Sequence, residues 1–240
     1  MSADWLRGDW PAPAPVRVLC TTRNGGFSVG PWRSMNLGEH CGDNPGNVRR
    51  NRQRLFGELP AEPQWLRQVH GTAVAVHPGH AGPEPEADAL VAFGPGQICA
   101  VLTADCLPVA FCDRAGSRVA VAHAGWRGLA GGVLQATVEA LACDPGELIA
   151  WLGPAIGPSA YEVGADVAEA FPDEFDEAFA ARGDRWLLDM YTVARLKLAA
   201  VGVTAVYGGG CCTYSDPERF YSYRRDGVTG RMATLVWIGA

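Results

Sequence analysis

Apolar residues occur along this chain in short runs that are separated by segments rich in glycine and proline. Three runs, at residues 98–103, 108–112 and 118–122, lie close together in the middle of the sequence. Their shortness, their valine content and the turn-forming residues 113–117 predict strands of a sheet that is covered on both faces. Further apolar runs predict strands at residues 16–22, 64–69, 73–77, 148–152, 203–207 and 232–238.

Apolar residues at helical spacing predict several helices between these strands. One helix begins at Gly125 and places Leu129, Val133, Ala136 and Ala140 on one face. Others are expected at residues 47–56, on both sides of residue 172, and at 190–201, where a glycine follows. Because strands and helices mix without regular alternation, we expect a single domain of the α/β class with a mixed sheet, or of the α+β class.

The start of the chain contains Pro11, Pro13 and Pro15, which favour a stiff, extended conformation. We therefore expect residues 1–15 to form an extended lead-in and residues 16–240 to form a single domain. The 30 glycines and 17 prolines indicate many loops, but together they stay below the share that marks low-complexity chains. No heptads and no recurring period of roughly 20–50 residues are present, which excludes coiled coils and repeat proteins.

The charge balance is acidic, with 20 Lys and Arg against 26 Asp and Glu and a net charge of −6. This balance argues against nucleic acid as a partner. No stretch approaches about 18 uninterrupted apolar residues, so we expect no membrane-spanning helix and no membrane partner. Residues 1–10 lack the apolar region of a signal peptide, so we expect a cytoplasmic protein, in which the eight cysteines would not form a disulfide framework.

Three side chains that can bind a metal lie where a predicted strand meets a turn: His70, Cys106 and His123. Residues at strand ends converge on one rim of a sheet, and one thiolate with two imidazoles would form a catalytic zinc site with an open fourth position. Their spacing matches no established metal motif and is weak evidence by itself, and each could instead be a buried or hydrogen-bonded residue at a strand end. The pairs His40–Cys41 and Cys211–Cys212 are rival ligand sets.

A glycine-rich segment, Gly125-Trp126-Arg127-Gly128, follows a predicted strand and opens a helix. The free N–H groups of a helix start and the guanidinium of Arg127 would together attract an anion such as phosphate. The glycines could instead serve only to bring the helix close to the sheet. Residues 220–227 mix aromatic and basic side chains, which suits either stacking on a base or an ordinary strand with a polar face.

The sequence contains, in this order, the segments Gln68-Val69-His70-Gly71, Thr103-Ala104-Asp105-Cys106-Leu107-Pro108, His123-Ala124-Gly125-Trp126-Arg127-Gly128, Gly153-Pro154-Ala155-Ile156-Gly157 and Tyr223-Arg224-Arg225-Asp226-Gly227 with Thr229-Gly230-Arg231. Together they resemble the YfiH/laccase-domain family, which has been called multicopper polyphenol oxidase and, more recently, purine nucleoside phosphorylase. The similarity runs from about Thr21 to Ile238, nearly the whole chain. Tyr221 stands where the family more often has Phe.

The resemblance implies a zinc ion held by His70, Cys106 and His123. It also implies phosphorolysis of adenosine, inosine, guanosine and methylthioadenosine, together with adenosine deaminase activity. The expected partners are therefore a purine nucleoside and phosphate, bound by a monomer or a small homo-oligomer.

For this activity the sequence offers candidates for two further roles. Arg127, with the helix start at Gly125 and Gly128, is the candidate for binding phosphate. Asp105 is the candidate, from its position alone, for handling a proton at the base.

Two alternative activities remain open. A laccase-like copper polyphenol oxidase needs a type 1 site and a trinuclear cluster, and therefore many more histidines than the five present, although copper can still occupy a His/Cys site in vitro. A cysteine-dependent amidase acting on cell-wall precursors would use Cys106 as its nucleophile, with His123 or His70 as the base. Cys106 is the only plausible nucleophile, because no G-x-S-x-G motif occurs.

Overall fold

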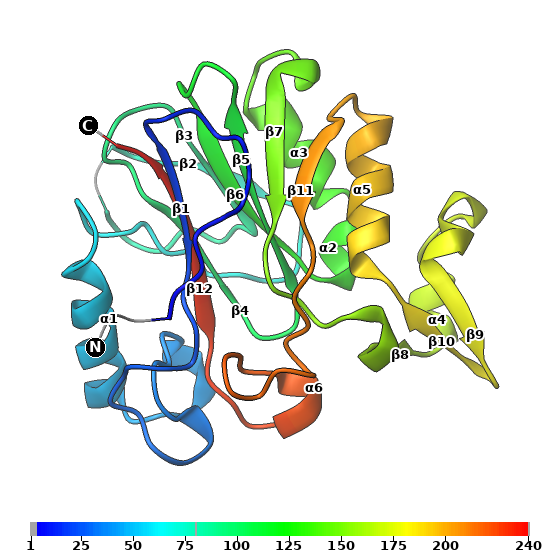
Figure 1. Cartoon of the computed structure of the whole chain (residues 1–240), viewed down its shortest axis with the longest axis horizontal. Helices are drawn as coiled ribbons and strands as arrows, with labels where there is room; N and C mark the ends of the chain where they lie inside the picture. The colour runs from blue at the N-terminus through cyan, green and yellow to red at the C-terminus, as the bar shows by residue number, and fades with distance from the viewer. Residues whose placement is uncertain (1–3, 80, 240) are drawn as a thin grey trace.

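A computed structural model describes residues 4–79 and 81–239, and its largest element is a six-stranded mixed sheet (Figure 1). The strand order is β11-β7-β5-β6-β3-β2, with parallel pairing of β2 with β3 and of β7 with β11, and antiparallel pairing elsewhere. The strands are β2 (Val74–Val76), β3 (Ala89–Ala92), β5 (Leu107–Asp113), β6 (Val119–Ala124), β7 (Leu148–Leu152) and β11 (Ala205–Gly208).

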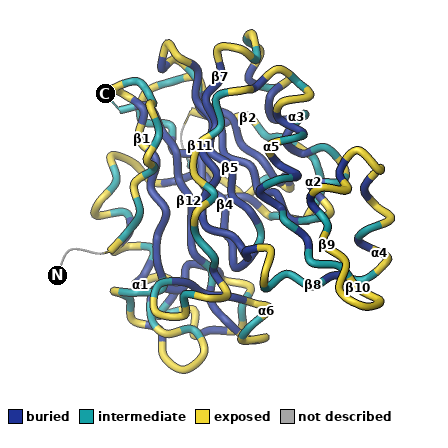
Figure 2. Tube along the Cα trace, turned by 45° about the vertical axis from the view of Figure 1, so that its right-hand side comes forward, coloured by how far each residue is buried: buried dark blue, intermediate teal, exposed yellow. Residues whose placement is uncertain are grey.

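A three-stranded antiparallel sheet packs against one face of the six-stranded sheet. It consists of β1 (Val16–Cys20), β12 (Met232–Ile238) and β4 (Cys99–Thr103), in the order β1-β12-β4. Along β5, Ala110 and Cys112 belong to the core between the two sheets, whereas Val109 and Phe111 belong to the core on the opposite face. Burial on both faces explains why these strands are continuous apolar runs (Figure 2).

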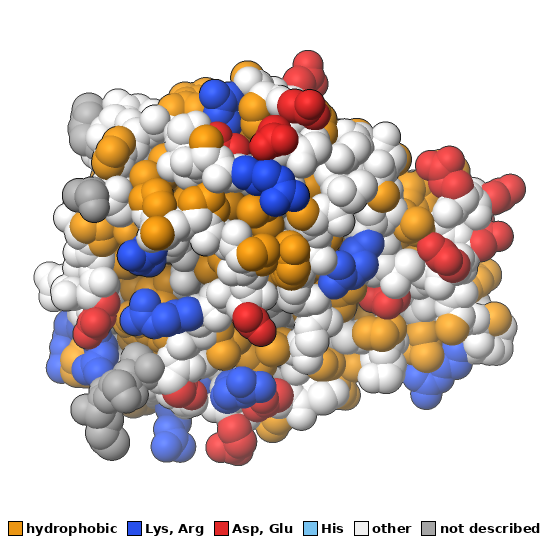
Figure 3. All heavy atoms as spheres, turned by 45° about the horizontal axis from the view of Figure 1, so that its top comes forward, with side chains coloured by type: hydrophobic (Ala, Val, Ile, Leu, Met, Phe, Trp, Pro, Cys, Tyr) orange, Lys and Arg blue, Asp and Glu red, His pale blue; other side chains and the backbone are white. Residues whose placement is uncertain are grey.

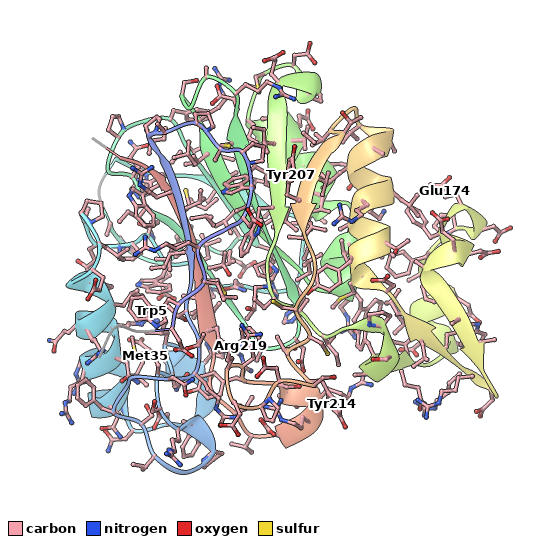
Figure 4. All side chains as sticks on the ribbon, viewed as in Figure 1. Trp5, Met35, Glu174, Tyr207, Tyr214 and Arg219 are labelled. Atoms are coloured by element: carbon pink, nitrogen blue, oxygen red, sulfur yellow. The ribbon has the colours of Figure 1, made fainter. Side chains whose placement is uncertain are left out.

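Helices form the two outer layers of the molecule (Figure 1). On the free face of the six-stranded sheet lie α2 (Trp126–Gly131), α3 (Val133–Ala140) and α5 (Met190–Ala200). The outer face of the three-stranded sheet packs against α1 (Pro45–Phe56), and Met35 lies in the apolar cluster between them (Figure 4). Among residues 4–79 and 81–239, no helix has the length and apolar character needed to cross a bilayer.

A small arm projects from one side of these layers (Figure 1). It contains a three-stranded sheet in the order β8-β10-β9, built from β8 (Glu162–Val163), β9 (Phe179–Arg182) and β10 (Arg185–Leu188), and the short helix α4 (Ala165–Ala168). Acidic side chains lie at its exposed edge, at the right of Figure 3. The remaining helices are α6 (Tyr223–Asp226) and 3-10 helices at Gly30–Trp32, Glu39–Cys41, Pro145–Glu147, Pro158–Ala160 and Asp173–Ala178.

The mixed α/β class and the single domain predicted from the sequence are confirmed, and the strands at 148–152 and 232–238 have the predicted bounds. The helix predicted after Gly125 is instead two helices, because Gly132 adopts a left-handed conformation (φ 97°) that ends α2 and begins α3. Residues 64–69 are not a strand, since only Gln64 and Arg67 form isolated bridges.

The strand alternative for residues 220–227 is also wrong. Ser222 accepts a hydrogen bond from the backbone N–H of Arg225 and so caps α6. The described part of the lead-in pairs with β1, because Leu6 and Cys20 exchange two backbone hydrogen bonds of 2.9 Å. Leu6 and Trp10 pack against the core between the sheets.

Candidate functional site

The layered sheets bring three strand ends to one edge of the molecule. β4 ends at Thr103, β5 begins at Leu107, and His123 is the last residue but one of β6. Pro108 pairs directly with His123 in the antiparallel register of β5 and β6. Cys106, in the tight turn between β4 and β5, is therefore held next to His123 by the register of the sheet.

His70 joins these two residues from the loop before β2, although it lies far from both in the sequence. The candidate ligand atoms of His70, Cys106 and His123 all lie within 4.8 Å of one another. The Cys106 Sγ is 3.9 Å from His70 Nε2, and the two imidazole rings meet edge to face with centroids 4.7 Å apart. In the part of the chain that the structure describes, this is the one group of three such residues close enough to share a metal ion.

The loop that carries His70 is fixed to the edge of β4 by the side chain of Gln68. The Gln68 amide accepts a hydrogen bond from Leu102 N at 2.8 Å and donates one to Leu102 O at 2.9 Å. It thus pairs with the backbone as a neighbouring strand would. His70 itself has a positive φ of 60°, which is uncommon for a residue with a side chain and needs support from its surroundings.

Asp88 supplies that support, and the sequence analysis missed it. Its side chain is fully buried just before β3 and accepts hydrogen bonds from the backbone N–H groups of His70 (2.9 Å), Gly71 (2.7 Å) and Val69 (3.2 Å). It also accepts from His123 Nδ1 at 2.8 Å. The sequence did contain a signal for it, since Asp88 stands between two alanines at the start of an apolar run. An acidic residue at such a position is expected to be buried, and a buried carboxylate needs hydrogen-bond partners.

The charges of the cluster stabilise one another. Burial alone would raise the pKa of Cys106, but the neighbouring His123 and His70 lower it to about 6. Burial alone would lower the pKa of His123, but Cys106 and Asp88 raise it to about 9. Burial likewise opposes ionisation of Asp88, yet the hydrogen bonds from His123 and Gly71 hold its pKa below the usual value. The cluster therefore favours a thiolate, the form of cysteine that binds metals.

Three observations show that this cluster fits a metal ion. Its donors are one thiolate and two imidazoles, as in catalytic zinc sites that keep a fourth position open. The bond from His123 Nδ1–H to Asp88 leaves Nε2 as the coordinating nitrogen, which is the usual outer-shell arrangement. Gly125 closes the site without a side chain, because a Cβ there would lie 2.9 Å from Cys106 Sγ and 3.2 Å from His70 Cδ2.

A cavity of about 720 Å³ opens beside the cluster and includes all three of its residues in the lining. This volume is in the range typical of small-molecule sites. Leu66, Leu102 and the exposed ring of Tyr223 provide apolar and aromatic lining, while Arg52 and Arg231 contribute positive charge.

Asp105 lies in the turn between β4 and β5, but both its carboxylate oxygens are already engaged by the protein. Thr213 Oγ1 donates to one oxygen at 2.6 Å, and Arg224 N donates to the other at 2.7 Å. The side chain is buried, and its φ of 92° is positive. These contacts tie the start of α6, and with it Tyr223, to the turn that carries Cys106.

Arg127 is exposed in the first turn of α2, where its guanidinium lies 4.2 Å above the ring of Trp126. It does not line the cavity beside the cluster. Gly128 is buried, and a Cβ there would lie 3.2 Å from Gly71 O and 3.4 Å from His123 O. Both glycines of this segment thus permit close packing around the cluster, and their role in binding phosphate stays a prediction.

The rival ligand pairs do not form a comparable cluster within the described residues. His40 lines the cavity, and burial raises the pKa of the adjacent Cys41. The Cys212 sulfur accepts a hydrogen bond from Gly157 N at 3.2 Å. Among the residues that the structure describes, neither pair has a third histidine, cysteine or carboxylate at metal-binding distance.

Residues 17–239 match the family described as multi-copper polyphenol oxidoreductase laccase. The chain is 53% identical to the purine nucleoside phosphorylase YfiH of Escherichia coli, over 95% of this chain and 96% of that protein. It is 54% identical to a purine nucleoside phosphorylase of Pseudomonas aeruginosa, over 98% of both chains.

Solved structures share the whole fold. The crystal structure of a Neisseria meningitidis protein has a TM-score of 0.96 and 51% identity, covering 99% of this chain and 100% of its own. That of YlmD from Geobacillus stearothermophilus has a TM-score of 0.94 and 32% identity, covering 100% of this chain and 98% of its own.

The close approach at Gly125 gives a first prediction. In Gly125→Ala the new methyl group would push Cys106 and His70 apart, so the variant should bind less than half as much metal as the wild-type protein when both are given zinc. Metal analysis measures the metal content, and circular dichroism measures whether the fold is retained. Gly210→Ala is the matched control, because a Cβ there meets no atom within 4 Å. A full metal content in Gly125→Ala would show that the close packing of Gly125 against Cys106 and His70 is not needed for metal binding.

Proposed function

The chain belongs to the multi-copper polyphenol oxidoreductase laccase family, and we propose that within it this protein is a zinc-dependent purine nucleoside phosphorylase. The observation that carries the proposal is the His70–Cys106–His123 cluster beside a cavity of about 720 Å³, together with relatives named for this activity. The proposed substrates are adenosine, inosine, guanosine and methylthioadenosine, with deamination of adenosine as a second reaction. Cytoplasmic location and a monomer or small homo-oligomer stay predictions.

The donor set supports zinc over multicopper chemistry. Among the described residues, only two histidines and one cysteine converge, which is enough for one ion but not for a type 1 copper together with a trinuclear cluster. His70, Cys106 and His123 would hold the zinc. When bound, zinc supplies Lewis-acid polarisation and activation of water, which hydrolytic deamination requires.

Phosphorolysis requires chiefly that the protein bind and orient two substrates, the nucleoside and phosphate. An oxygen of hydrogen phosphate forms a bond to the anomeric carbon of the ribose while the bond from that carbon to the purine nitrogen breaks. The electron pair stays on the purine, which gains the proton of the phosphate, and ribose 1-phosphate is released. Tyr223, exposed at the cavity, is the proposed stacking surface for the purine, as the aromatic and basic composition of residues 220–227 suggested.

One observation also supports the amidase alternative. The Cys106 sulfur is within 4 Å of His70 Nε2, and a thiolate beside an imidazole is the arrangement that thiol nucleophiles use. In this alternative, the Cys106 thiolate would attack the amide carbonyl, the C–N bond would break as the imidazole protonates the leaving amine, and water would hydrolyse the thioester without any need for phosphate.

The phosphorylase and the amidase differ in their need for phosphate and for zinc. Given adenosine and phosphate under anaerobic conditions with defined zinc, we expect adenine and ribose 1-phosphate, and without phosphate mainly inosine. Cys106→Ser should lose at least about 100-fold in nucleoside turnover and most of its zinc, because a metal ligand is weakened. Product analysis by chromatography and metal analysis on the same samples measure both outcomes.

Each rival predicts a different pattern. An oxidase would need oxygen and would form coloured quinones from phenols. An amidase would ignore nucleosides and would keep its activity after zinc chelation but lose it on alkylation of Cys106. Either pattern, with no turnover of any purine nucleoside, would contradict the proposal.

A proton-handling role for Asp105 can be tested separately. In Asp105→Asn the amide can still accept from Arg224 N and donate to the Thr213 hydroxyl, so the local structure should persist while the ionisable group is lost. Since both oxygens already bind the protein, we expect turnover within about threefold of normal and an unchanged pH profile. A loss of roughly 100-fold or more, with a changed profile, would instead identify Asp105 as a proton carrier.

A further inference from the structure

The cavity beside the cluster is lined by three arginines, and these differ in how their charge is balanced. Arg52 lies 3.3 Å from Glu39 and 3.7 Å from Glu84, and Arg67 lies 2.6 Å from Glu86. Arg231 forms no ion pair within residues 4–79 and 81–239.

The guanidinium of Arg231 is only partly used by its own loop. Its Nη1 donates to the carbonyl oxygens of Thr229 (3.2 Å) and Gly230 (3.0 Å). For Nε and Nη2, the described residues offer no hydrogen-bond partner. The guanidinium also lies 5.9 Å from the centre of the Tyr223 ring. A half-buried guanidinium with two unused donors and no ion pair is suited to a phosphate or carboxylate, which it can bind through two parallel hydrogen bonds.

The backbone of Arg231 is held in place by Asn36, which is fully buried. The Asn36 Oδ1 accepts from Arg231 N and from Gly38 N, both at 2.9 Å, and its Nδ2 donates to Gly38 O and to Asp43 Oδ2. The same amide therefore fixes both Arg231 and the turn that leads to His40.

Close packing also fixes the stem of the Arg231 side chain. A Cβ on Gly38 would lie 2.8 Å from Arg231 Cγ, so the stem lies directly against this glycine. His40, two residues further on, lines the same cavity. Burial and the charges of Arg231 and Arg52 lower the pKa of His40, and a histidine ring in its neutral form offers one N–H donor.

We propose that Arg231, assisted by His40, binds the phosphate co-substrate in the cavity beside the metal-binding cluster. This assignment rests on the proposed phosphorylase function and differs from the helix start at Arg127, which lies outside the lining of that cavity. His40 and the ligand His70 line the same cavity as Arg231, so an anion on Arg231 would share that cavity with a nucleoside held beside the cluster.

The test is the dependence of turnover on inorganic phosphate at saturating inosine. Arg231→Met keeps the apolar stem against Gly38 but removes the charge and the donors, and it should raise the KM for phosphate roughly 10- to 100-fold. The KM for inosine and the deamination of adenosine without phosphate should change much less than the KM for phosphate does. Arg231→Lys keeps the charge but not the paired donors of the guanidinium, so its KM for phosphate should lie between those of the wild-type protein and Arg231→Met. Arg49→Met, on the exposed surface of α1, is the control for loss of one positive charge.

Arg127→Met separates the two candidate sites. A large rise in the KM for phosphate in Arg127→Met, with none in Arg231→Met, would overturn the assignment in favour of the helix start. A parallel loss of phosphorolysis and deamination in Arg231→Met, with zinc content reduced, would also overturn it, because Arg231 would then support the cluster itself.

Direct titration with inorganic phosphate in a calorimeter keeps this test independent of the proposed function. If the unchanged protein turns over no nucleoside, the phosphorylase proposal fails. Binding of phosphate that is lost in Arg231→Met but retained in Arg49→Met would still establish the anion site. Equal binding in Arg231→Met and the unchanged protein would refute the assignment whatever the activity.

Discussion

The carboxylate of Asp88 lies fully buried between the two segments that carry the histidines of the cluster, and it accepts a hydrogen bond from the His123 ring and three from the backbone around His70. A buried negative charge is costly unless its oxygens are fully paired, so these four donors must converge for the charge to persist. Their convergence sets the orientation of His123 and supports the positive φ of His70. The buried carboxylate of Asp88 thus holds both histidines of the candidate metal-binding site from behind, while the site itself opens to the cavity.

The sheets supply the rest of this geometry. Because β5 and β6 are buried on both faces and paired in a fixed register, the Cys106 turn and His123 cannot shift past each other without disturbing both cores. Gly125 then brings the start of α2 against the cluster, and Asn36 brings Arg231 to the cavity beside it. The site combines a rigid strand edge with loops that are fixed by buried amides and a carboxylate, which suits preorganised binding of a ligand.

Much of the fold could be predicted from the sequence, for identifiable reasons. The β7 and β12 runs are apolar, of strand length and bounded by turn residues, so their bounds were predicted correctly. The break at Gly132 was missed because a glycine within a helical pattern is often tolerated. The three candidate ligands were singled out because each was expected where a predicted strand meets a turn, although the structure has no strand before His70. Asp88 was missed because a lone aspartate usually lies on the surface. The proximity of Arg231 to His40 depends on Asn36, which no local pattern reveals.

The most direct test of the central role of Asp88 is the zinc affinity of Asp88→Asn, measured by titrating the metal-free protein in competition with a chelator of known affinity. The matched control is Asp113→Asn, because Asp113 is also nearly buried and accepts from Ser117 N and Arg118 N at the opposite end of β5. If Asp88 organises the cluster, its replacement weakens zinc binding roughly 10- to 100-fold while Asp113→Asn leaves it unchanged. Equal zinc affinity in Asp88→Asn and the unchanged protein would contradict this account.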